Sequence, residues 1–410
     1  MSFRRALTAL VCAWLFAAAA AAQGASPPGA AATPAPTVYL MTFGPGPAVW
    51  ERFGHNAIWI HDSAAGSDQA YNYGLFDFAQ EHFLLRFIQG QMWYWMAGFP
   101  AGRYVGQYER DNRSVWVQEL EIPPDAAREL QRFLQWNELP DHRFYHYDYY
   151  RDNCSTRVRD ALDRVLAGAI HDQSVSRPAG TTYRFHTQRL TASDPLIATG
   201  LLLALGEGVD RPISQWEEMF LPLSMREHLR SITVTGPDGV RKPLVRSERT
   251  LYESSAPPPP AAPPSWLRWY LLIGVAIGGL ALVLARPARR SAVARFGFLV
   301  IVLGWSAVIG LAGSVLSGLW GFTDHVMAYR NENLLQATPL AMLLLVLAIG
   351  AVRGRRRARV AFIVAAAIAL LSVVGLLAKV LPAFDQANWP VIALALPAHL
   401  GIAAAFRRLR

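Results

Sequence analysis

The sequence predicts an exported α+β domain followed by an all-α transmembrane domain of five helices. Three observations lead to this fold class. The chain of 410 residues begins with a short apolar segment that follows two arginines, has strand-like and helix-like patterns in its middle, and ends in five long apolar segments. In addition, 52% of its residues are hydrophobic and only 17% are charged, which is unusual for a soluble protein.

Residues 1–22 have the organisation of a secretory signal peptide. Arg4 and Arg5 precede an apolar run that ends in three small residues, so we expect cleavage before Gln23. The alternative is an uncleaved first transmembrane helix. Residues 23–36 form a Pro/Ala-rich linker that is not expected to pack.

The exported domain is expected over residues 37–255, and a second Pro-rich linker follows it at 256–265. Alternating apolar residues and turn signals predict strands and a hairpin, and helical spacing with capping residues predicts two helices. We therefore expect an antiparallel sheet with helices packed on one side. The expected strands are residues 55–62, 69–76 and 113–122, and the expected helices are 124–137 and 154–167, the second capped by Asp152 or Asn153.

The five apolar segments of the domain at residues 266–410 are each close to the ~20 residues that cross a bilayer. They are residues 267–285, 296–319, 335–352, 360–381 and 390–406. Arginine clusters follow the first, third and fifth segments, which places these ends and the C-terminus in the cytoplasm. The exported domain then faces outward from a multi-pass protein of the inner (cytoplasmic) membrane.

The net charge of +9 first suggests a nucleic-acid-binding protein, but the basic residues are concentrated in one part of the chain. Residues 266–410 have 15 basic and 3 acidic side chains, a net charge of +12. Residues 1–265 have 24 basic and 27 acidic side chains, a net charge of −3, or −5 without Arg4 and Arg5. We therefore expect an integral membrane protein with no nucleic-acid partner.

Cys154 is the only cysteine that follows the expected signal peptide. A lone cysteine in an oxidising compartment is buried and inert, pairs with another chain, or is a reactive thiol. The expected helix N-terminus favours the thiolate, and its free N–H groups can stabilise an oxyanion. This makes Cys154 a candidate nucleophile, with Asn153 and Asp152 as the candidate cap and oxyanion residues.

A nucleophilic thiol needs a base, and His55 is the best placed of the ten histidines because it opens a predicted strand after a tight turn. His61 is on the same strand face and is a candidate secondary partner. Asn72 and Asp77, on or just after the next predicted strand, are candidates for the group that orients the imidazole. For any single histidine, the alternative is an ordinary surface or core residue.

Three motifs, in this order and ahead of five apolar segments, resemble the bacterial Lnb-type lipoprotein N-acylation transferase family. They are Phe53-Gly54-His55-Asn56-Ala57, Tyr71-Asn72-Tyr73-Gly74-Leu75-Phe76-Asp77-Phe78 and Asp152-Asn153-Cys154-Ser155. The resemblance implies a circularly permuted papain-like (NlpC/P60-like) exported domain, in which the histidine precedes the cysteine. It also implies that Cys154 is the nucleophile and His55 the base.

The resemblance implies that the enzyme moves an acyl chain from the diacylglyceryl group of a lipoprotein to its N-terminal amine through a Cys154 thioester. No metal or cofactor is expected. Two other functions stay open, a membrane-anchored peptidoglycan amidase or peptidase of the NlpC/P60-like class and a non-catalytic envelope scaffold. The Ala- and Arg-rich composition suggests a source in which another enzyme N-acylates lipoproteins, so a different acylated membrane lipid is an alternative substrate.

The substrate must be reached at the bilayer, and two regions are candidates for binding it. The candidate substrate-binding residues are Tyr73 in the second motif, Tyr149 shortly before the third motif, and His325, Asn331 and Asn333 in the outward loop before the third helix. The aromatic stretch at residues 83–99 either enters the membrane interface or lines an acyl groove. The alternatives are a solvated loop for the first region and a core helix for the second.

Overall fold

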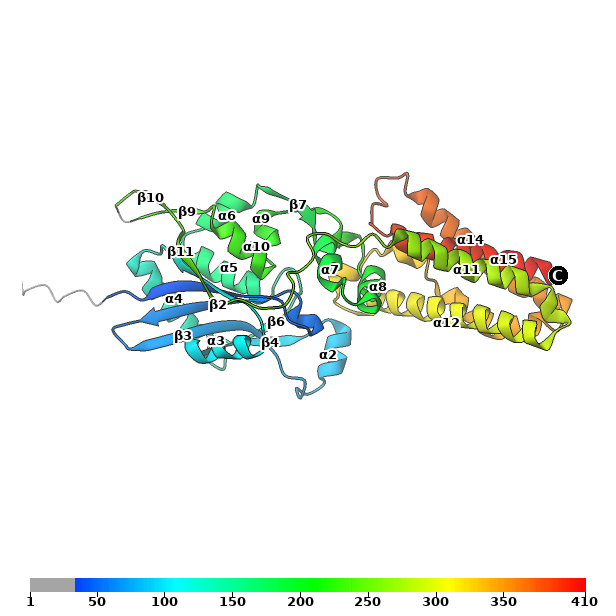
Figure 1. Ribbon diagram of the computed structural model, residues 1–410, viewed down its shortest axis with the longest axis horizontal. Coiled ribbons are helices and arrows are strands. Elements are labelled where there is room, and N and C mark those ends of the chain that lie inside the picture. The colour runs from blue at the N-terminus through cyan, green and yellow to red at the C-terminus, as the bar shows by residue number, and fades with distance from the viewer. Residues whose placement is uncertain (1–33, 237) are drawn as a thin grey trace, which may run out of the picture.

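The computed structural model describes residues 34–236 and 238–410. A sheet-rich domain and a bundle of long helices lie end to end, and the C-terminus is at the end of the bundle farthest from the sheet (Figure 1). The expected signal peptide and most of the first linker lie outside the described residues. The second linker, residues 256–265, forms no helix or strand.

The sheet of the first domain has seven antiparallel strands in the order β11-β5-β1-β2-β3-β4-β6. Of the three predicted strands, β2 has the predicted bounds, and β3 and β5 differ from them by one or two residues. The strands are β1 (Thr37–Phe43), β2 (His55–Asp62), β3 (Ser67–Leu75), β4 (Trp93–Pro100), β5 (Val115–Leu120), β6 (Phe144–His146) and β11 (Val245–Tyr252).

Helices cover both faces of this sheet, whereas the sequence predicted a single helical layer. α4 (Pro124–Asn137) and α5 (Cys154–Val165) share one buried cluster with Ile58. α3 (Ala101–Arg110) packs on the other face, in a cluster with Ala57. Neighbouring strand residues point to opposite faces. The prediction missed this layer because α3 is a short helix, in which the apolar side formed by Ala101, Tyr104, Val105 and Tyr108 alternates with glycine and charged residues.

Shorter elements complete the domain. α2 precedes β4, and the others follow α5. α7 and α8 lie at the side of the domain that faces the helical bundle, whereas β9 and β10 lie at the end away from it (Figure 1). They are α2 (Phe83–Gln89), α6 (Ala169–Ser174), β7 (Pro178–Thr182), α7 (Tyr183–Thr191), α8 (Pro195–Ala204), β8 (Pro212–Ser214), α9 (Gln215–Glu218), α10 (Pro222–Leu229), β9 (Thr233–Thr235) and β10 (Arg241–Pro243).

The second domain has five segments long and apolar enough to span a membrane, as the sequence predicted. The third segment is not a continuous α-helix. Two 3-10 turns, η5 (Glu332–Leu335) and η6 (Pro339–Met342), precede its α-helical half, because a proline interrupts the helical hydrogen bonds. The helices are α11 (Leu267–Ala285), α12 (Ala292–Phe322), α13 (Leu343–Ala351), α14 (Arg355–Ala378) and α15 (Trp389–Arg408).

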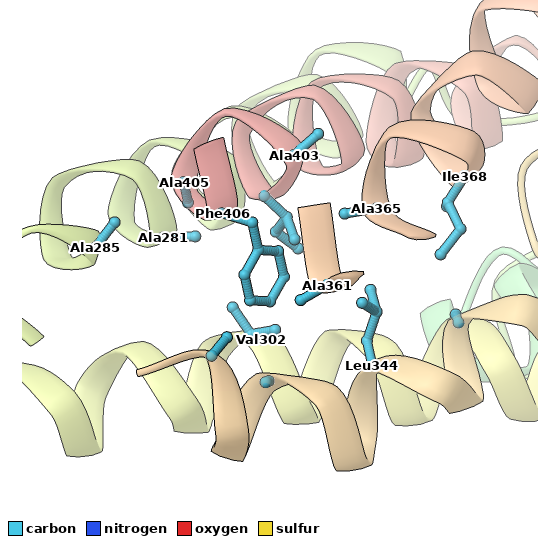
Figure 2. Close-up of a cluster of buried hydrophobic side chains, with 14 of the residues drawn as sticks. Ala281, Ala285, Val302, Leu344, Ala361, Ala365, Ile368, Ala403, Ala405 and Phe406 are labelled. Atoms are coloured by element: carbon cyan, nitrogen blue, oxygen red, sulfur yellow. The ribbon is translucent and has the colours of Figure 1, made fainter. Parts of the chain in front are cut away.

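Small residues allow the membrane helices to pack closely. Alanines of α11, α14 and α15 line the buried cluster, and Phe406 fills its centre against Val302 (Figure 2). Gly278 of α11 and Gly401 of α15 lie in direct contact, and neither position has room for a side chain. Lipid provides little hydrophobic driving force for helix association, so this close packing supplies much of the stability of the bundle.

Candidate active site

Cys154 is the first residue of α5, and Asn153 is the N-cap of that helix. The Asn153 Oδ1 accepts hydrogen bonds from the backbone N–H groups of Ser155 and Thr156, both at 2.9 Å. Of the two capping candidates, Asp152 is therefore not the cap, and its carboxylate pairs with the guanidinium of Arg157 instead. The cysteine is held at a rigid helix terminus.

This capping reduces the set of oxyanion donors that the sequence suggested. The N–H groups of Ser155 and Thr156 are occupied by Asn153. The N–H of Cys154 itself has no partner within residues 34–236 and 238–410. The Cys154 N–H is therefore the helix N-terminal donor that is free to stabilise an oxyanion on an acyl group attached to the thiol.

His55 and Asn72 form the second part of the site. The His55 Nε2 lies 3.2 Å from the Asn72 Oδ1, and the Asn72 Nδ2 donates to the carbonyl of Ala70 at 2.9 Å. The second bond fixes the amide orientation, so the Asn72 oxygen faces the imidazole. Because that oxygen only accepts, the Nε2 carries the hydrogen and the Nδ1 of neutral His55 is free to act as a base.

Strands β2 and β3, which carry these two residues, both pack against α5. Gly74 makes this possible, since a Cβ there would lie 3.1 Å from the Cys154 Cβ, and its φ is +89°. Cys154 and His55 both keep partial solvent exposure. Among the described residues, no hydrogen bond joins the thiol to the imidazole, as is common in substrate-free enzymes.

Gly74→Ala is expected to destabilise the domain and disturb the site. An alanine at this position would be strained by the left-handed backbone conformation and would also press against Cys154. Together these two effects should cost roughly 1–3 kcal/mol of unfolding free energy. Gly66→Ala is the matched control, since Gly66 has a φ of +63° but no atom within 4 Å of its Cβ position. Thermal unfolding of both variants tests this, and an equal loss in both would mean that the contact with Cys154 contributes nothing.

Asn56 is a site residue that the sequence analysis did not single out. Its buried amide lies 2.9 Å from the Ser155 hydroxyl, whichever way the amide is oriented. This hydrogen bond ties the residue after His55 to the residue after Cys154, and so fixes β2 against α5. The sequence feature that could have indicated this role is a polar amide at an inward position of an otherwise apolar strand.

The protonation state of the pair differs from the expected thiolate. Burial raises the pKa of the Cys154 thiol to about 11, although nearby backbone N–H groups and Arg113 act in the opposite direction. Burial, with a contribution from Arg113, lowers the pKa of His55 to about 4, and the bond to Asn72 opposes this. At neutral pH the site therefore holds a thiol and a neutral imidazole, and the proton moves only when the sulfur attacks.

Cys154 alkylation by iodoacetamide should follow this raised pKa. Only the thiolate reacts, so the rate at pH 7 should be low and should rise about tenfold per pH unit until it levels off near pH 11. Mass spectrometry of the protein after timed labelling measures the rate, because Cys154 is the only cysteine outside the expected signal peptide. A plateau reached below pH 8 would contradict a neutral resting pair.

Arg113 and a group of tyrosines surround the pair. Arg113 donates to the carbonyl of Gly44 at 2.9 Å and pairs with Glu51 at 3.1 Å, which holds its charge near the site. Burial raises the pKa of every tyrosine in the group, and a negative charge on Cys154 raises it further. The group consists of Tyr94, Tyr104, Tyr108, Tyr145 and Tyr147. The surroundings of the thiol are therefore mostly apolar rings.

Three candidates from the exported domain lie away from the His55–Asn72 hydrogen bond. The Tyr73 hydroxyl is buried on the opposite sheet face, where it donates to Asn137 at 2.8 Å. Asp77 is exposed and accepts from the backbone N–H of Ala79 at 2.8 Å, so Asn72 rather than Asp77 contacts His55. His61 is at the far end of β2, where it bonds to Asp68 at 2.7 Å.

Tyr149 lies in the loop before α5 and is partly exposed. Its backbone carbonyl accepts a hydrogen bond from the Asn153 side chain at 3.0 Å, and its ring contacts that of Tyr147 edge to face, with centroids 5.7 Å apart. Of the two tyrosines expected to bind substrate, Tyr149 therefore contacts the cap residue before Cys154 and is exposed, whereas Tyr73 is buried.

A substrate-binding loop would expose Asn331 and Asn333 to solvent, but the structure does not. Both are buried, and their amides donate to backbone carbonyls at the C-terminal end of α8, including that of Leu203. Next to them, the side chains of Lys379 and Glu332 form a buried ion pair. These residues join the exported domain to the membrane bundle and cap a helix whose last carbonyls need partners.

Comparison with known families agrees with this two-part structure. Residues 29–189, which contain His55, Asn72 and Cys154, match the family described as the Lnb N-terminal periplasmic domain. Residues 280–403 match the family described as the Lnb transmembrane domain. No curated protein and no solved structure matches the chain. The two family matches together cover well over half of the sequence, and the chain belongs to the Lnb family of multi-pass membrane proteins with a periplasmic domain.

Proposed function

We propose that this protein is a cysteine-dependent acyltransferase that moves an acyl chain from the diacylglyceryl group of a lipoprotein to its N-terminal amine. The observation that carries the proposal is a thiol at a capped helix N-terminus that a hydrogen bond between Asn56 and Ser155 ties to the strand of a histidine oriented by an asparagine, within the matched Lnb domain. The order of histidine strand before cysteine helix also supports a permuted papain-like domain.

In the first half-reaction, Cys154 attacks the ester carbonyl of the sn-2 acyl chain. The Nδ1 of His55 takes the thiol proton as the S–C bond forms, because the thiol is protonated at rest. The Cys154 N–H donates to the oxyanion. The ester C–O bond then breaks, and the glycerol oxygen leaves with the proton from His55, which produces an acyl-thioester and a lyso-lipid.

In the second half-reaction, the free amine of the lipoprotein attacks the thioester carbonyl. His55 takes a proton from the amine nitrogen and returns it to the sulfur as the C–S bond breaks, which gives an amide and a free thiol. Water at the same position would hydrolyse the thioester. The buried tyrosine rings around Cys154 favour the amine by limiting the access of water.

The orientation in the inner membrane belongs to the same proposal. The C-terminus lies at the end of the bundle farthest from the exported domain (Figure 1). A bundle with an odd number of spans places its two ends on opposite sides. The C-terminal arginines are then cytoplasmic and the Cys154 site is periplasmic, at the outer surface of the inner membrane.

Mass spectrometry of lipoprotein N-termini, with and without the protein, tests this function. We expect an N-acylated lyso-form that depends on the protein and on Cys154. Unchanged lipoproteins together with altered muropeptides would replace the proposal with a peptidoglycan amidase. If the protein acts on a different acylated lipid, lipoproteins would be unchanged and the lyso-form of that lipid would accumulate.

A further inference from the structure

Helix α2 exposes an unusual amount of apolar surface for a short helix. Four of its seven residues, Leu84, Leu85, Phe87 and Ile88, are large apolar side chains that are between 44% and 68% exposed. None of the residues of α2 is buried. A contiguous apolar patch of this kind on a domain surface marks a binding face for an apolar partner.

The C-terminal end of α2 is fixed to the outer end of a membrane-spanning helix. The backbone N–H of Asp324 donates to the carbonyl of Gln89 at 2.7 Å, and the Nε2 of His325 donates to the carbonyl of Phe87 at 2.9 Å. Asp324 and His325 directly follow α12, whose last residue, Phe322, is 87% exposed. α2 lies at the end of the exported domain that faces the bundle (Figure 1). Its apolar face therefore continues the lipid-facing surface of α12.

A series of aromatic rings leads from α2 toward the nucleophile. The ring of Phe87 lies 6.3 Å from that of Phe83, which lies 6.4 Å from that of Phe76. Phe76 is 5.1 Å from Tyr94, and Tyr94 is 4.1 Å from Tyr147. Tyr94, Tyr147 and Cys154 pack against the same buried cluster. We call these five rings the aromatic track.

Beside α2, an open groove of about 530 Å³ combines positive charge with aromatic rings. Arg86 of α2 and Arg143 line it together with Trp93 and Trp95, and Asp77 is its acidic residue. Tryptophan rings and arginine side chains are typical of the level of lipid headgroups, where the stems contact acyl chains and the charged ends contact phosphates. The groove thus places headgroup-type chemistry next to the apolar face of α2.

We propose that α2 inserts into the outer surface of the bilayer that holds the five helices, and that the aromatic track guides an acyl chain from this leaflet to Cys154. The occupant of the apolar face is lipid, because the face is continuous with the membrane-facing surface of α12. The guidance of an acyl chain rests on the acyltransferase function proposed above, whereas the insertion of α2 does not.

The insertion is tested with a fluorescent label in phospholipid vesicles. An environment-sensitive dye is attached to Leu85→Cys in the full-length Cys154→Ala protein, reconstituted with lipids that carry a nitroxide quencher on the acyl chain. Val240→Cys is the matched control, since Val240 is 52% exposed and Leu85 is 51% exposed, and Val240 directly precedes β10, far from the bundle (Figure 1). We expect quenching at position 85 and none at position 240. Equal quenching, or a blue-shifted dye at position 85 that lipid does not quench, would overturn the insertion.

The acyl path is tested with Leu85→Asp in the same vesicles. A charge on the inserted face should weaken insertion and lower acyl transfer from a bilayer-embedded diacylglyceryl peptide on the order of tenfold, while Val240→Asp stays within about twofold of wild type. Thermal unfolding checks that both variants are folded. Wild-type rates in Leu85→Asp would overturn the path. Lipid quenching at position 85 without acyl transfer by the wild-type protein would refute the proposed function and leave the insertion intact.

Discussion

Replacement of Cys154 with alanine should abolish acyl transfer while the protein stays folded. In the proposed mechanism the thiol forms the covalent intermediate, so its loss should lower the rate by a factor on the order of 10⁴ to 10⁶. Stability should change little, because the helix cap is made by Asn153 and not by the sulfur. Transfer from a diacylglyceryl peptide in vesicles gives the rate, and thermal unfolding gives the stability.

The Cys154→Ser variant tests the covalent intermediate more directly. The serine hydroxyl keeps the shape of the site but is a weaker nucleophile than the thiol. The neighbouring Ser155 hydroxyl, which donates to the carbonyl of Met219, shows that this helix terminus accommodates a hydroxyl. A trapped, slowly resolving acyl-enzyme in the serine variant would support the covalent intermediate directly. If Cys154→Ala retained more than about a tenth of the wild-type rate, the thioester mechanism would be abandoned.

His55→Ala should reduce the rate by a factor on the order of 10² to 10⁴ if the imidazole is the general base. The reason lies in the resting protonation state. Since burial raises the pKa of the Cys154 thiol to about 11, almost no thiolate exists at neutral pH without a base that accepts its proton. The loss in this variant should therefore shrink as the pH approaches 11, where hydroxide produces the thiolate.

His61→Ala is the matched control, because His61 lies on the same strand and the same face as His55 but bonds to Asp68, away from the thiol. Its rate should stay within about twofold of wild type. A tenfold loss in His61→Ala together with a normal rate in His55→Ala would assign the role of general base to His61.

The pH dependence of the rate, measured on the acid side, is a further test of His55. In the proposed mechanism the neutral form of His55 is the active one, so activity should fall only as the pH drops through about 4, the lowered pKa of this group.

Local sequence patterns were sufficient for the main elements of both domains. The helix of Cys154, with a cap at Asp152 or Asn153, and the strand of His55 were predictable because each depends on neighbouring residues, through capping, periodicity and turn signals. The five membrane spans were predictable because the bilayer imposes a length and a hydropathy on each. The strands β1 and β4 and the helices α2 and α3 were not predicted, because their patterns are short or mixed.

The sequence could not choose among polar residues of similar spacing. Asn72 and Asp77 were equal candidates for orienting His55, and the pairing of β2 with β3 decides between them because it brings Ala57 opposite Asn72. Asn331 and Asn333 resembled an exposed polar loop, whereas the docking of α8 turns their amides toward its carbonyls. Both outcomes depend on contacts between residues that are far apart in the chain.

The sequence by itself indicated a membrane protein with an exported domain and a candidate nucleophile, since the signal-peptide pattern, the arginine distribution and the one cysteine after the expected signal peptide are properties of composition and order. Tertiary structure alone decided the protonation of that cysteine. A helix N-terminus favours a thiolate, but Cys154 packs against the same buried cluster as Tyr94 and Tyr147, and this partial burial raises the pKa of its thiol. The loss of solvation outweighs the helix dipole and the nearby N–H groups, because transferring a charge out of water costs more than these partial charges return.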